Sequence, residues 1–202
     1  VQAGFKNFLF LVGYKGEFIE NYFKNGNQYG LSIKYSYDGE KLLGTGGSLR
    51  KSIDLLEDDF LLIYGDSYMD INYEEIVYHY FYYKEHNSID ALMAVFKNEG
   101  KFDKSNVLFR DNKLISYDKN NITPEMNYID YGISILNKEI INKIPADVFY
   151  DIAIEYTELV KQNKMSGYEV KRRFFEIGTP ASLSEFTSYI LWKNSNKHKA
   201  VF

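Results

Sequence analysis

The stretch FLLIYGDSYMD, residues 60–70, decides the fold. Its first five residues are apolar, which is typical of a strand buried on both faces, and the run ends at Gly65 and Asp66. Such a strand brings Asp66 to the carboxyl edge of a sheet, where open α/β sheets bind their ligands. With Asp70 and Asn72 close behind, several oxygen ligands could converge on a hard cation such as magnesium. The alternative is a turn followed by a helix cap, which Asp and Asn also favour.

Strand-like and helix-like segments alternate on both sides of this stretch. The alternation predicts an α/β domain with a largely parallel sheet. We expect strands at 7–13, 31–37, 60–64, 90–97, 106–109, 113–117, 128–136 and 168–175, and helices at 17–24, 48–56, 73–85, 150–162 and 181–192. Asn72 and Glu75 have the spacing of a capping box at the start of the third of these helices.

The composition excludes several classes of protein. A net charge of -4 gives no basic footprint for nucleic acid, and the absence of cysteine excludes disulfides and thiolate metal sites. The three histidines lack ligand spacing, so we expect no zinc site. No apolar run approaches the roughly 18 residues that span a bilayer, and no signal peptide is evident. We therefore expect a cytoplasmic protein that binds neither nucleic acid nor membrane.

A second motif, LLGTGGSLR at 42–50, places Gly44, Thr45, Gly46 and Gly47 just before a predicted helix. Backbone N–H groups at such a point could receive a phosphate, a ribose or a base edge. The spacing fits neither the P-loop nor the Rossmann glycine pattern. A plain strand-to-helix turn is the alternative.

A third motif, RRFFEIGTPASL at 172–183, ends a predicted strand at Glu176 and enters a helix through Gly178 and Pro180. Glu176 is a second carboxylate at a strand terminus, and it could face Asp66 and hold one metal with it. The alternative is a helix-entry turn with an exposed glutamate.

In this order the motifs resemble the sugar-1-phosphate nucleotidyltransferases, with mannose-1-phosphate and heptose-1-phosphate guanylyltransferase-like enzymes as the closest branch. The resemblance covers about residues 4–189 and rests on LVGYKGEFIENYF, LSIKYSYDGEKLLGTGGSLR, FLLIYGDSYMDIN, YIDYGISIL, GYEV and FFEIGTPASLSEF. It implies the Rossmann-like, three-layer nucleotidyltransferase fold with a mostly parallel mixed sheet.

The resemblance also implies roles for individual residues. Gly44, Thr45 and Gly46 match the loop that packs on the nucleotide base and ribose, so the glycines would make room for a nucleoside. Asp66 matches a magnesium-binding aspartate that is also catalytic. Glu176 stands where many relatives have the second metal-binding aspartate, and its extra methylene changes the geometry of that ligand.

Three further residues match the family's sugar-phosphate site. Asp118 and Lys119 stand where the family has a Glu-Lys pair, and Gly132 matches the glycine whose backbone meets the sugar. The implied reaction is attack by the sugar-1-phosphate oxygen on the α-phosphorus of a nucleoside triphosphate, with Mg²⁺ aligning the groups and pyrophosphate leaving. The product would be an NDP-sugar for cell-surface polysaccharide.

Several points stay open. GTP is favoured from the nearest branch alone, and the sugar and any homo-oligomer are undetermined. One alternative is a non-catalytic relative that binds a sugar nucleotide as a regulatory or assembly subunit. Another is a metal-dependent glycosyltransferase, although the EIGTP turn argues against it.

Both ends of the chain depart from a complete enzyme of this family. The family opens with a strand and a G-G-x-G-T-R loop that grips the triphosphate, and nothing here matches them. We therefore expect 1–192 to be an N-terminally incomplete nucleotidyltransferase domain that lacks its first strand and Gly-rich loop. We expect 193–202, KNSNKHKAVF, to be a linker, and KHKAVF resembles the first strand of a haloacid-dehalogenase-type phosphatase that would be fused behind it.

Overall fold

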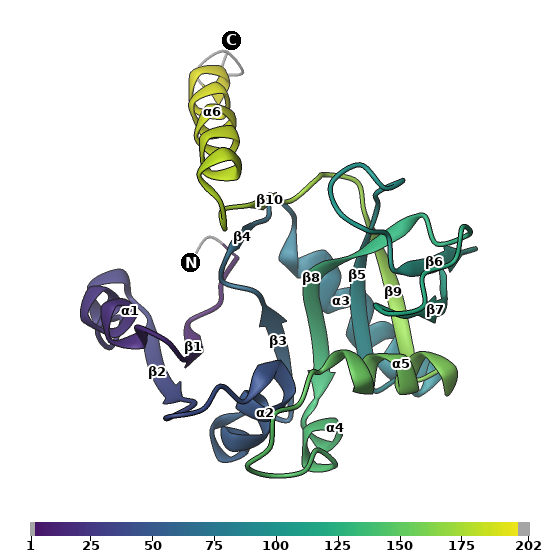
Figure 1. The fold of residues 1–202 in the computed structure, drawn as a ribbon, viewed down its shortest axis with the longest axis horizontal. Coiled ribbons are helices and arrows are strands. Elements are labelled where there is room, and N and C mark those ends of the chain that lie inside the picture. The colour runs from purple at the N-terminus through teal and green to yellow at the C-terminus, as the bar shows by residue number, and fades with distance from the viewer. Residues whose placement is uncertain (1–2, 198–202) are drawn as a thin grey trace.

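The computed structural model describes residues 3–197 (Figure 1). In chain order the elements are β1 (Asn7–Val12), α1 (Gly16–Phe23), β2 (Ser32–Tyr37), α2 (Gly44–Lys51), β3 (Asp59–Ile63), β4 (Ser67–Tyr68), α3 (Tyr73–Asn87), β5 (Ala91–Lys97), β6 (Val107–Arg110), β7 (Lys113–Tyr117), β8 (Tyr128–Asn137), α4 (Lys138–Asn142), α5 (Ala153–Lys161), β9 (Met165–Val170), β10 (Phe175–Glu176) and α6 (Pro180–Lys197). Across this described part, no helix combines the length and the apolarity that a membrane crossing needs.

The larger sheet is six-stranded, with the order β7-β6-β8-β5-β9, and β3 pairs with β8 as well. β8 runs antiparallel to β3, β5 and β6, whereas β5 and β9 are parallel. The mixed sheet therefore has β3, β5, β6 and β9 in one direction and β7 and β8 in the other. As a result, the ends of β3, β5 and β9 and the start of β8 lie at the same edge.

Helices cover both faces of this sheet. Along β5, Ala91, Met93 and Val95 join one buried cluster, and Leu92 and Ala94 join the other. The first cluster also contains residues of α2, α4 and α5, and the second contains residues of α3. The predicted three-layer α/β fold is confirmed. The apolar run at 60–64 does form a strand between the two clusters, but its side chains are half-buried and Ile63 is 40% exposed, so the expected burial on both faces is only partial.

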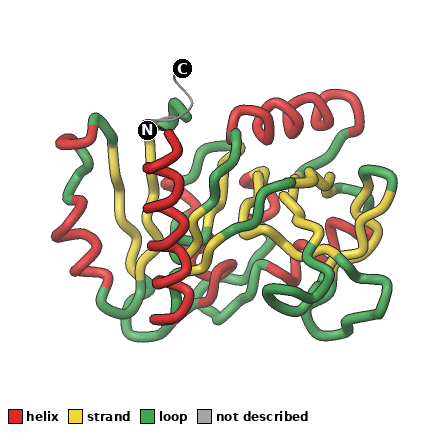
Figure 2. Tube along the Cα trace, turned by 90° about the horizontal axis from the view of Figure 1, so that it is seen from above, coloured by secondary structure: helices red, strands yellow, loops and turns green. Residues whose placement is uncertain are grey.

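The N-terminal unit is a separate parallel pair of strands with α1 beside it (Figures 1 and 2). β1 pairs with β2 from Asn7↔Ser32 to Val12↔Tyr37, and it forms no ladder with another strand of the described chain. Most β1 side chains are only half-buried, in contrast to those of β5.

Three sequence-based bounds are wrong. The helix expected at 48–56 begins at Gly44 and ends at Lys51. The strand expected at 168–175 is two strands, because β9 follows its parallel partner β5 to Val170 and the chain then leaves the sheet to pair β10 with β4. Helix α6 continues through Lys197, so the predicted linker starts inside a helix. The apolar end of the proposed phosphatase strand, 198–202, lies outside the described residues.

Candidate functional site

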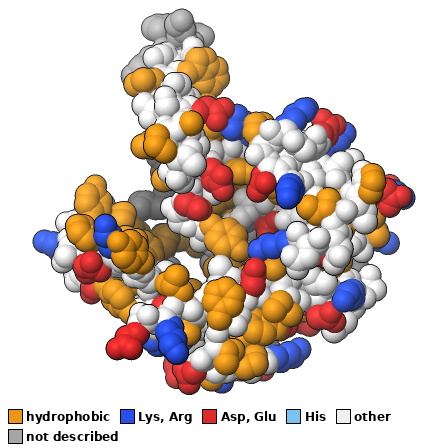
Figure 3. Space-filling model, in the orientation of Figure 1, with side chains coloured by type: hydrophobic (Ala, Val, Ile, Leu, Met, Phe, Trp, Pro, Cys, Tyr) orange, Lys and Arg blue, Asp and Glu red, His pale blue; other side chains and the backbone are white. Residues whose placement is uncertain are grey.

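The candidate site lies at the sheet edge where β3 ends and β8 begins. Ile63 pairs with Ile133, and the Tyr64 N–H donates to the Gly132 carbonyl at 3.4 Å, so the exit of β3 touches the entry of β8. In the space-filling view, acidic and basic side chains surround a hollow near the middle of this face (Figure 3). The predicted site residues can be placed around it one group at a time.

Asp66 and Glu176 lie on neighbouring segments beyond β3. Glu176 is directly opposite Ser67 in the β4–β10 ladder, and the Ile177 N–H donates to the Asp66 carbonyl at 2.8 Å. Both acidic residues are exposed, and within residues 3–197 neither forms an ion pair with a lysine or arginine. The structure thus brings together the two strand-terminal acids that the sequence singled out.

Asp70 and Asn72 do not join them, which corrects the expectation of converging oxygen ligands. The Asp70 carboxylate pairs with Lys193 at 2.7 Å and Arg172 at 2.9 Å, and Tyr189 donates to it. Asn72 caps α3 by accepting from the Glu74 N–H at 3.1 Å. Asp70 therefore anchors α6 to the 68–70 segment, and Asn72 is a helix cap.

The glycine motif packs against the chain's own backbone. The Gly46 and Gly47 N–H groups both donate to the Tyr150 carbonyl, at 2.9 and 3.2 Å. A Cβ on Gly47 would come within 2.6 Å of the Val148 carbonyl oxygen, and one on Gly44 within 2.8 Å of the Tyr150 oxygen. Such contacts admit only glycine, so the motif has a packing reason that needs no ligand.

Nucleotide binding by residues 44–47 stays a prediction. The two amides that could have received a phosphate are already occupied by Tyr150. The Thr45 hydroxyl accepts from the Ile152 N–H at 3.1 Å and lies 3.4 Å from an Asp151 carboxylate oxygen. Thr45, at the start of α2, thus connects this helix to the 151–152 segment.

The side chains of Asp118 and Lys119 have different partners. The Asp118 carboxylate accepts from the backbone N–H groups of Asn121 and Asn120, and these hydrogen bonds hold its pKa below the usual value. Lys119 reaches toward the site, with its Nζ 3.4 Å from the Asp151 carboxylate. Of this predicted pair, only Lys119 contacts another acid of the candidate site, and the phosphate role of both residues stays a prediction.

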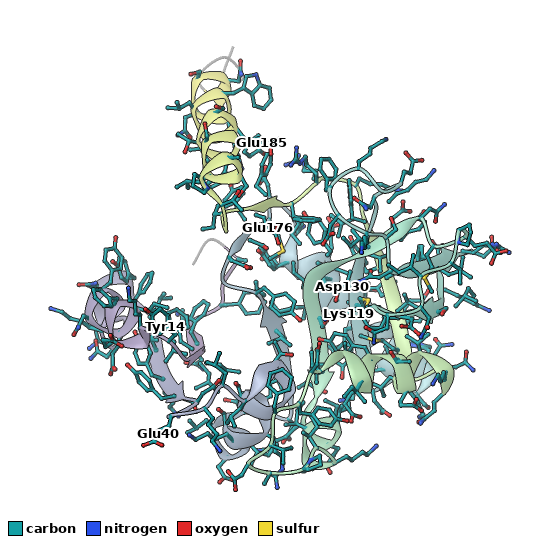
Figure 4. All side chains as sticks on the ribbon, in the orientation of Figure 1. Tyr14, Glu40, Lys119, Asp130, Glu176 and Glu185 are labelled. Atoms are coloured by element: carbon teal, nitrogen blue, oxygen red, sulfur yellow. The ribbon has the colours of Figure 1, made fainter. Side chains whose placement is uncertain are left out.

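Gly132 has a backbone reason to be glycine. Its φ of 81° is in the left-handed region, and a Cβ would meet the Tyr64 ring at 3.2 Å. Its N–H donates to the Asp130 carboxylate at 2.9 Å. The position predicted to meet a sugar therefore also fixes Asp130, which lies next to Lys119 in Figure 4.

Tyr64 shows which acids share one site. Burial raises the pKa of its phenol, and the negative charges of Asp130, Asp151 and Asp66 raise it further. Sequence reasoning missed Tyr64, Asp130 and Asp151. The only signal for Asp130 was a carboxylate inside an otherwise apolar strand, and nothing in the sequence marks Asp151, which enters through the fold of the 148–152 segment.

The comparisons with known proteins place this geometry in a family context. No protein-family model matches the chain. A D-glycero-alpha-D-manno-heptose 1-phosphate guanylyltransferase from Aneurinibacillus thermoaerophilus is 29% identical over 184 residues, which cover 89% of this chain and 76% of that protein. The protein of the same name from Campylobacter jejuni is 26% identical over 92% of this chain and 79% of its own length.

Solved structures agree on the fold. HddC from Yersinia pseudotuberculosis superposes with a TM-score of 0.70 at 19% identity, over 91% of this chain and 78% of that one. The resemblance that the motifs predicted is confirmed: the chain is similar in sequence to sugar-1-phosphate guanylyltransferases and similar in fold to HddC.

Proposed function

We propose that this chain forms the site of a guanylyltransferase that joins GTP and a heptose or mannose 1-phosphate into a GDP-sugar with release of pyrophosphate. The observation that carries the proposal is the sheet edge where β3 ends: the Asp66 and Glu176 segments pair there, and Lys119 contacts Asp151 at 3.4 Å. The charges of Asp130, Asp151 and Asp66 all raise the pKa of Tyr64 at this edge. The names of the sequence relatives support the guanine base and the heptose. Binding at the carboxyl edge of an α/β sheet fits this class of ligand.

Magnesium is the cofactor that these residues fit. Asp66 and Glu176 lie on the two segments that pair as β4 and β10, and neither carboxylate has a lysine or arginine partner in the described chain. Carboxylate oxygens are ligands that Mg²⁺ prefers. Residues 3–197 contain no cluster of three or more acids or histidines that could hold a metal unaided. Mg²⁺ usually takes one or two carboxylates and completes its shell with phosphate oxygens and water. When bound, it would neutralise phosphate charge.

The chain's own residues would then divide the remaining work. Lys119 supplies a positive charge beside the sugar phosphate, with Asp151 holding its ammonium in place. The Gly132 N–H fixes Asp130, and the start of α2 positions Thr45. Bringing two anionic substrates together at fixed groups is the main catalytic task in phosphoryl and nucleotidyl transfer.

The test is pyrophosphate release by the full-length protein with Mg²⁺, each of the four nucleoside triphosphates, and mannose, heptose and glucose 1-phosphates. We expect GTP with a heptose or mannose 1-phosphate to be the best pair. Asp66→Asn should lower kcat/KM by about 100-fold or more, because it weakens the charge that orders the metal and phosphates. The matched control Asp54→Asn changes an exposed residue outside the site and should leave the rate unchanged.

Two outcomes would contradict the proposal. Binding of GDP-sugars without any pyrophosphate would make the chain a sugar-nucleotide-binding subunit. Release of nucleoside diphosphate from a sugar nucleotide would make it a glycosyltransferase. Two variants of Glu176 test the metal site independently of the reaction. Mn²⁺ binding, measured by electron paramagnetic resonance, should survive Glu176→Asp, which keeps a carboxylate, and should weaken in Glu176→Gln, which removes the charge.

A further inference from the structure

The strand pair that brings Asp66 and Glu176 together is too short to be stable by itself. β4 and β10 contain two residues each, and they pair as Phe175↔Tyr68 and Glu176↔Ser67. An isolated two-stranded ribbon is at best marginally stable in water, even when it is longer than this one. The placement of the two acids therefore depends on contacts outside the strand pair.

The β4–β10 pair is closed at one end by the backbone and at the other by a carboxylate. Beyond Glu176, the Ile177 N–H donates to the Asp66 carbonyl at 2.8 Å. At the other end, the Asp70 carboxylate accepts from the Arg172 guanidinium at 2.9 Å. Asp70 therefore joins the segment that follows β4 to the segment that precedes β10.

Helix α6, which follows β10 in the chain, reaches the same carboxylate. The Tyr189 hydroxyl donates to Asp70 Oδ2 at 2.9 Å, and Lys193 Nζ lies 2.7 Å from Asp70 Oδ1. Lys193 also donates to the Tyr68 hydroxyl at 3.1 Å. Figure 1 shows α6 rising from the β4–β10 pair and projecting away from the larger sheet. Asp70 is thus the shared partner of groups that lie before and after β10.

Tyr189 connects this carboxylate to the residue next to Glu176. The Tyr189 ring stacks on Phe175 with the ring centroids 4.3 Å apart, and Phe175 is buried. Tyr68, which is opposite Phe175, packs against Phe186 of α6 with the centroids 4.9 Å apart. Successive residues of a strand point to opposite faces. Helix α6 therefore covers the Phe175 face of β10, and the Glu176 side chain is presented on the other face.

We propose that Asp70 is a positioning residue that fixes the β4–β10 pair and thereby places Glu176 beside Asp66 to receive the metal. This role rests on the metal site of the function proposed above. Asp70 is not itself a ligand, because both of its oxygens already accept from Arg172 and from side chains of α6. Groups that orient the ligands of a metal change its affinity strongly when they are removed, although they do not touch the metal.

A second ion pair on α6 provides a matched comparison. Glu185, labelled on α6 in Figure 4, accepts from both terminal nitrogens of Arg173, at 2.7 and 3.2 Å. The same guanidinium lies 4.1 Å from the ring centroid of Phe102 and 4.5 Å from that of Phe175. Glu185→Gln therefore weakens the attachment of α6 and leaves the bonds of Asp70 in place.

The experiment measures the Kd of Mn²⁺ for the full-length protein by electron paramagnetic resonance. The variants are Asp70→Asn, Tyr189→Phe, the two combined, and Glu185→Gln as the control. Asn keeps the shape of Asp70 and removes its charge, whereas Phe keeps the stacked ring of Tyr189 and removes its hydroxyl. Glu176→Gln shows whether the Mn²⁺ is bound at the proposed site. Urea unfolding of each variant gives its stability, and Mn²⁺ is titrated where each variant is folded.

We expect Asp70→Asn to raise the Kd of Mn²⁺ by about 10-fold, the lower end of the range for groups that support metal ligands. Tyr189→Phe should raise it by about threefold, because it removes one hydrogen bond to Asp70. The two effects should not add in the combined variant, since the two changes act on the same hydrogen bond. Glu185→Gln should stay within about twofold of the wild type, even where it lowers the free energy of unfolding as much as Asp70→Asn does.

Three results would overturn the proposal. If Glu176→Gln weakens Mn²⁺ binding and neither Asp70→Asn nor Tyr189→Phe does, the strand pair places Glu176 without Asp70. If Asp70→Asn and Glu185→Gln weaken it equally, any loosening of α6 disturbs the site, and the role of Asp70 is only structural. If the wild type binds no Mn²⁺, the chain has no metal site for Asp70 to support.

Pyrophosphate release by the same samples separates this inference from the proposed function. A wild type that releases pyrophosphate, with an unchanged Kd of Mn²⁺ in Asp70→Asn, would overturn the positioning role alone. A wild type that releases no pyrophosphate, but whose Mn²⁺ affinity falls in Asp70→Asn and not in Glu185→Gln, would overturn the proposed reaction and support the positioning role.

Discussion

Asp59 and Asp130 stand at opposite ends of the same strand pair, β3–β8, and the protein treats them in opposite ways. Asp59 receives hydrogen bonds from Tyr80 and Lys84, both at 2.6 Å, and from Asn137 at 3.0 Å. Asp130 receives one, from the Gly132 N–H.

The pKa values of the two carboxyls follow this difference. Burial alone would raise the pKa of Asp59, but its hydrogen bonds from Lys84, Tyr80 and Asn137 outweigh burial and lower it. Burial wins at Asp130 and raises the pKa to about 6. The Asp59 end of the strand pair is therefore completed by the protein itself, whereas the Asp130 carboxylate, at the open end, accepts a single hydrogen bond within the described residues.

The largest expected effect is at the completed end. Asp59→Ala should lower the free energy of unfolding by about 3 kcal/mol, because it leaves Lys84 and the Tyr80 hydroxyl without their shared partner at a site where the Asp59 side chain is 16% exposed. Urea unfolding would measure it. The exposed neighbour gives the control, since Asp58→Ala should cost less than about 0.5 kcal/mol. Equal effects of the two changes would refute a structural role for the Asp59 cluster.

The open end should respond in the opposite direction. In the folded state the raised pKa of Asp130 means that the proton is bound more tightly than in the unfolded chain. Stability therefore falls as pH rises from about 4 to 6, and the penalty is complete above the folded value. Asp130→Asn removes this penalty and should raise the free energy of unfolding by about 1–2 kcal/mol at pH 8.

The pH dependence makes that prediction specific. The gain from Asp130→Asn should shrink toward zero at pH 4, where the wild-type carboxyl is protonated. Parallel urea curves at pH 8 and pH 4 would show it. If Asp130→Asn raised the free energy of unfolding equally at pH 8 and pH 4, Asn would stabilise for a reason other than the lost charge. If it lowered the free energy of unfolding at pH 8, the carboxylate of Asp130 would be stabilising, as that of Asp59 is.

Acid should weaken the Asp59 end selectively. Because the folded-state pKa of Asp59 is lowered, its contribution is fully present above the ordinary value of about 3.9 and is lost as pH falls through the folded value. We expect this to account for about 1 kcal/mol of acid destabilisation, since the group is partly solvated. Asp59→Asn should flatten the stability curve below pH 4, and an unchanged slope would argue against it.

The same two ends show what sequence could and could not predict. Asp66 and Glu176 could be predicted because each ends a recognisable apolar run, and strand ends map directly to a sheet edge. The start of α2 could not, because Gly44 enters the helix through contacts with residue 150, more than a hundred positions away. The glycine motif suggested room for a ligand, and the structure shows that the same glycines also pack against the chain's own 148–152 segment, while nucleotide binding there stays a prediction.

Sequence does not show which of Asp59 and Asp130 is fully hydrogen-bonded, although Asp59 ends a run of three acids and Asp130 is a single acid inside its strand. What separates them is the partner that the fold supplies: Lys84 comes from α3, 25 residues from Asp59, whereas Asp130 meets a lysine already shared with Asp151. The local sequence pattern predicts a strand and the sheet edge at which it ends. The completeness of a hydrogen-bond set is a property of the whole fold.

The smallest effects come from a matched pair of tyrosines. Tyr80 and Tyr117 are 0% and 2% exposed, but only the Tyr80 hydroxyl has a partner within the described residues, namely Asp59. Tyr80→Phe should therefore cost about 1 kcal/mol, while Tyr117→Phe, which removes an unpaired buried hydroxyl, should add about 0.5 kcal/mol. Because both changes delete the same atom, the opposite signs in urea unfolding would isolate the hydrogen bond from packing. If Tyr117→Phe were destabilising, the Tyr117 hydroxyl would have a hydrogen-bond partner in solution. The Asp130 end of the strand pair would then have fewer unpaired polar groups than the structure shows.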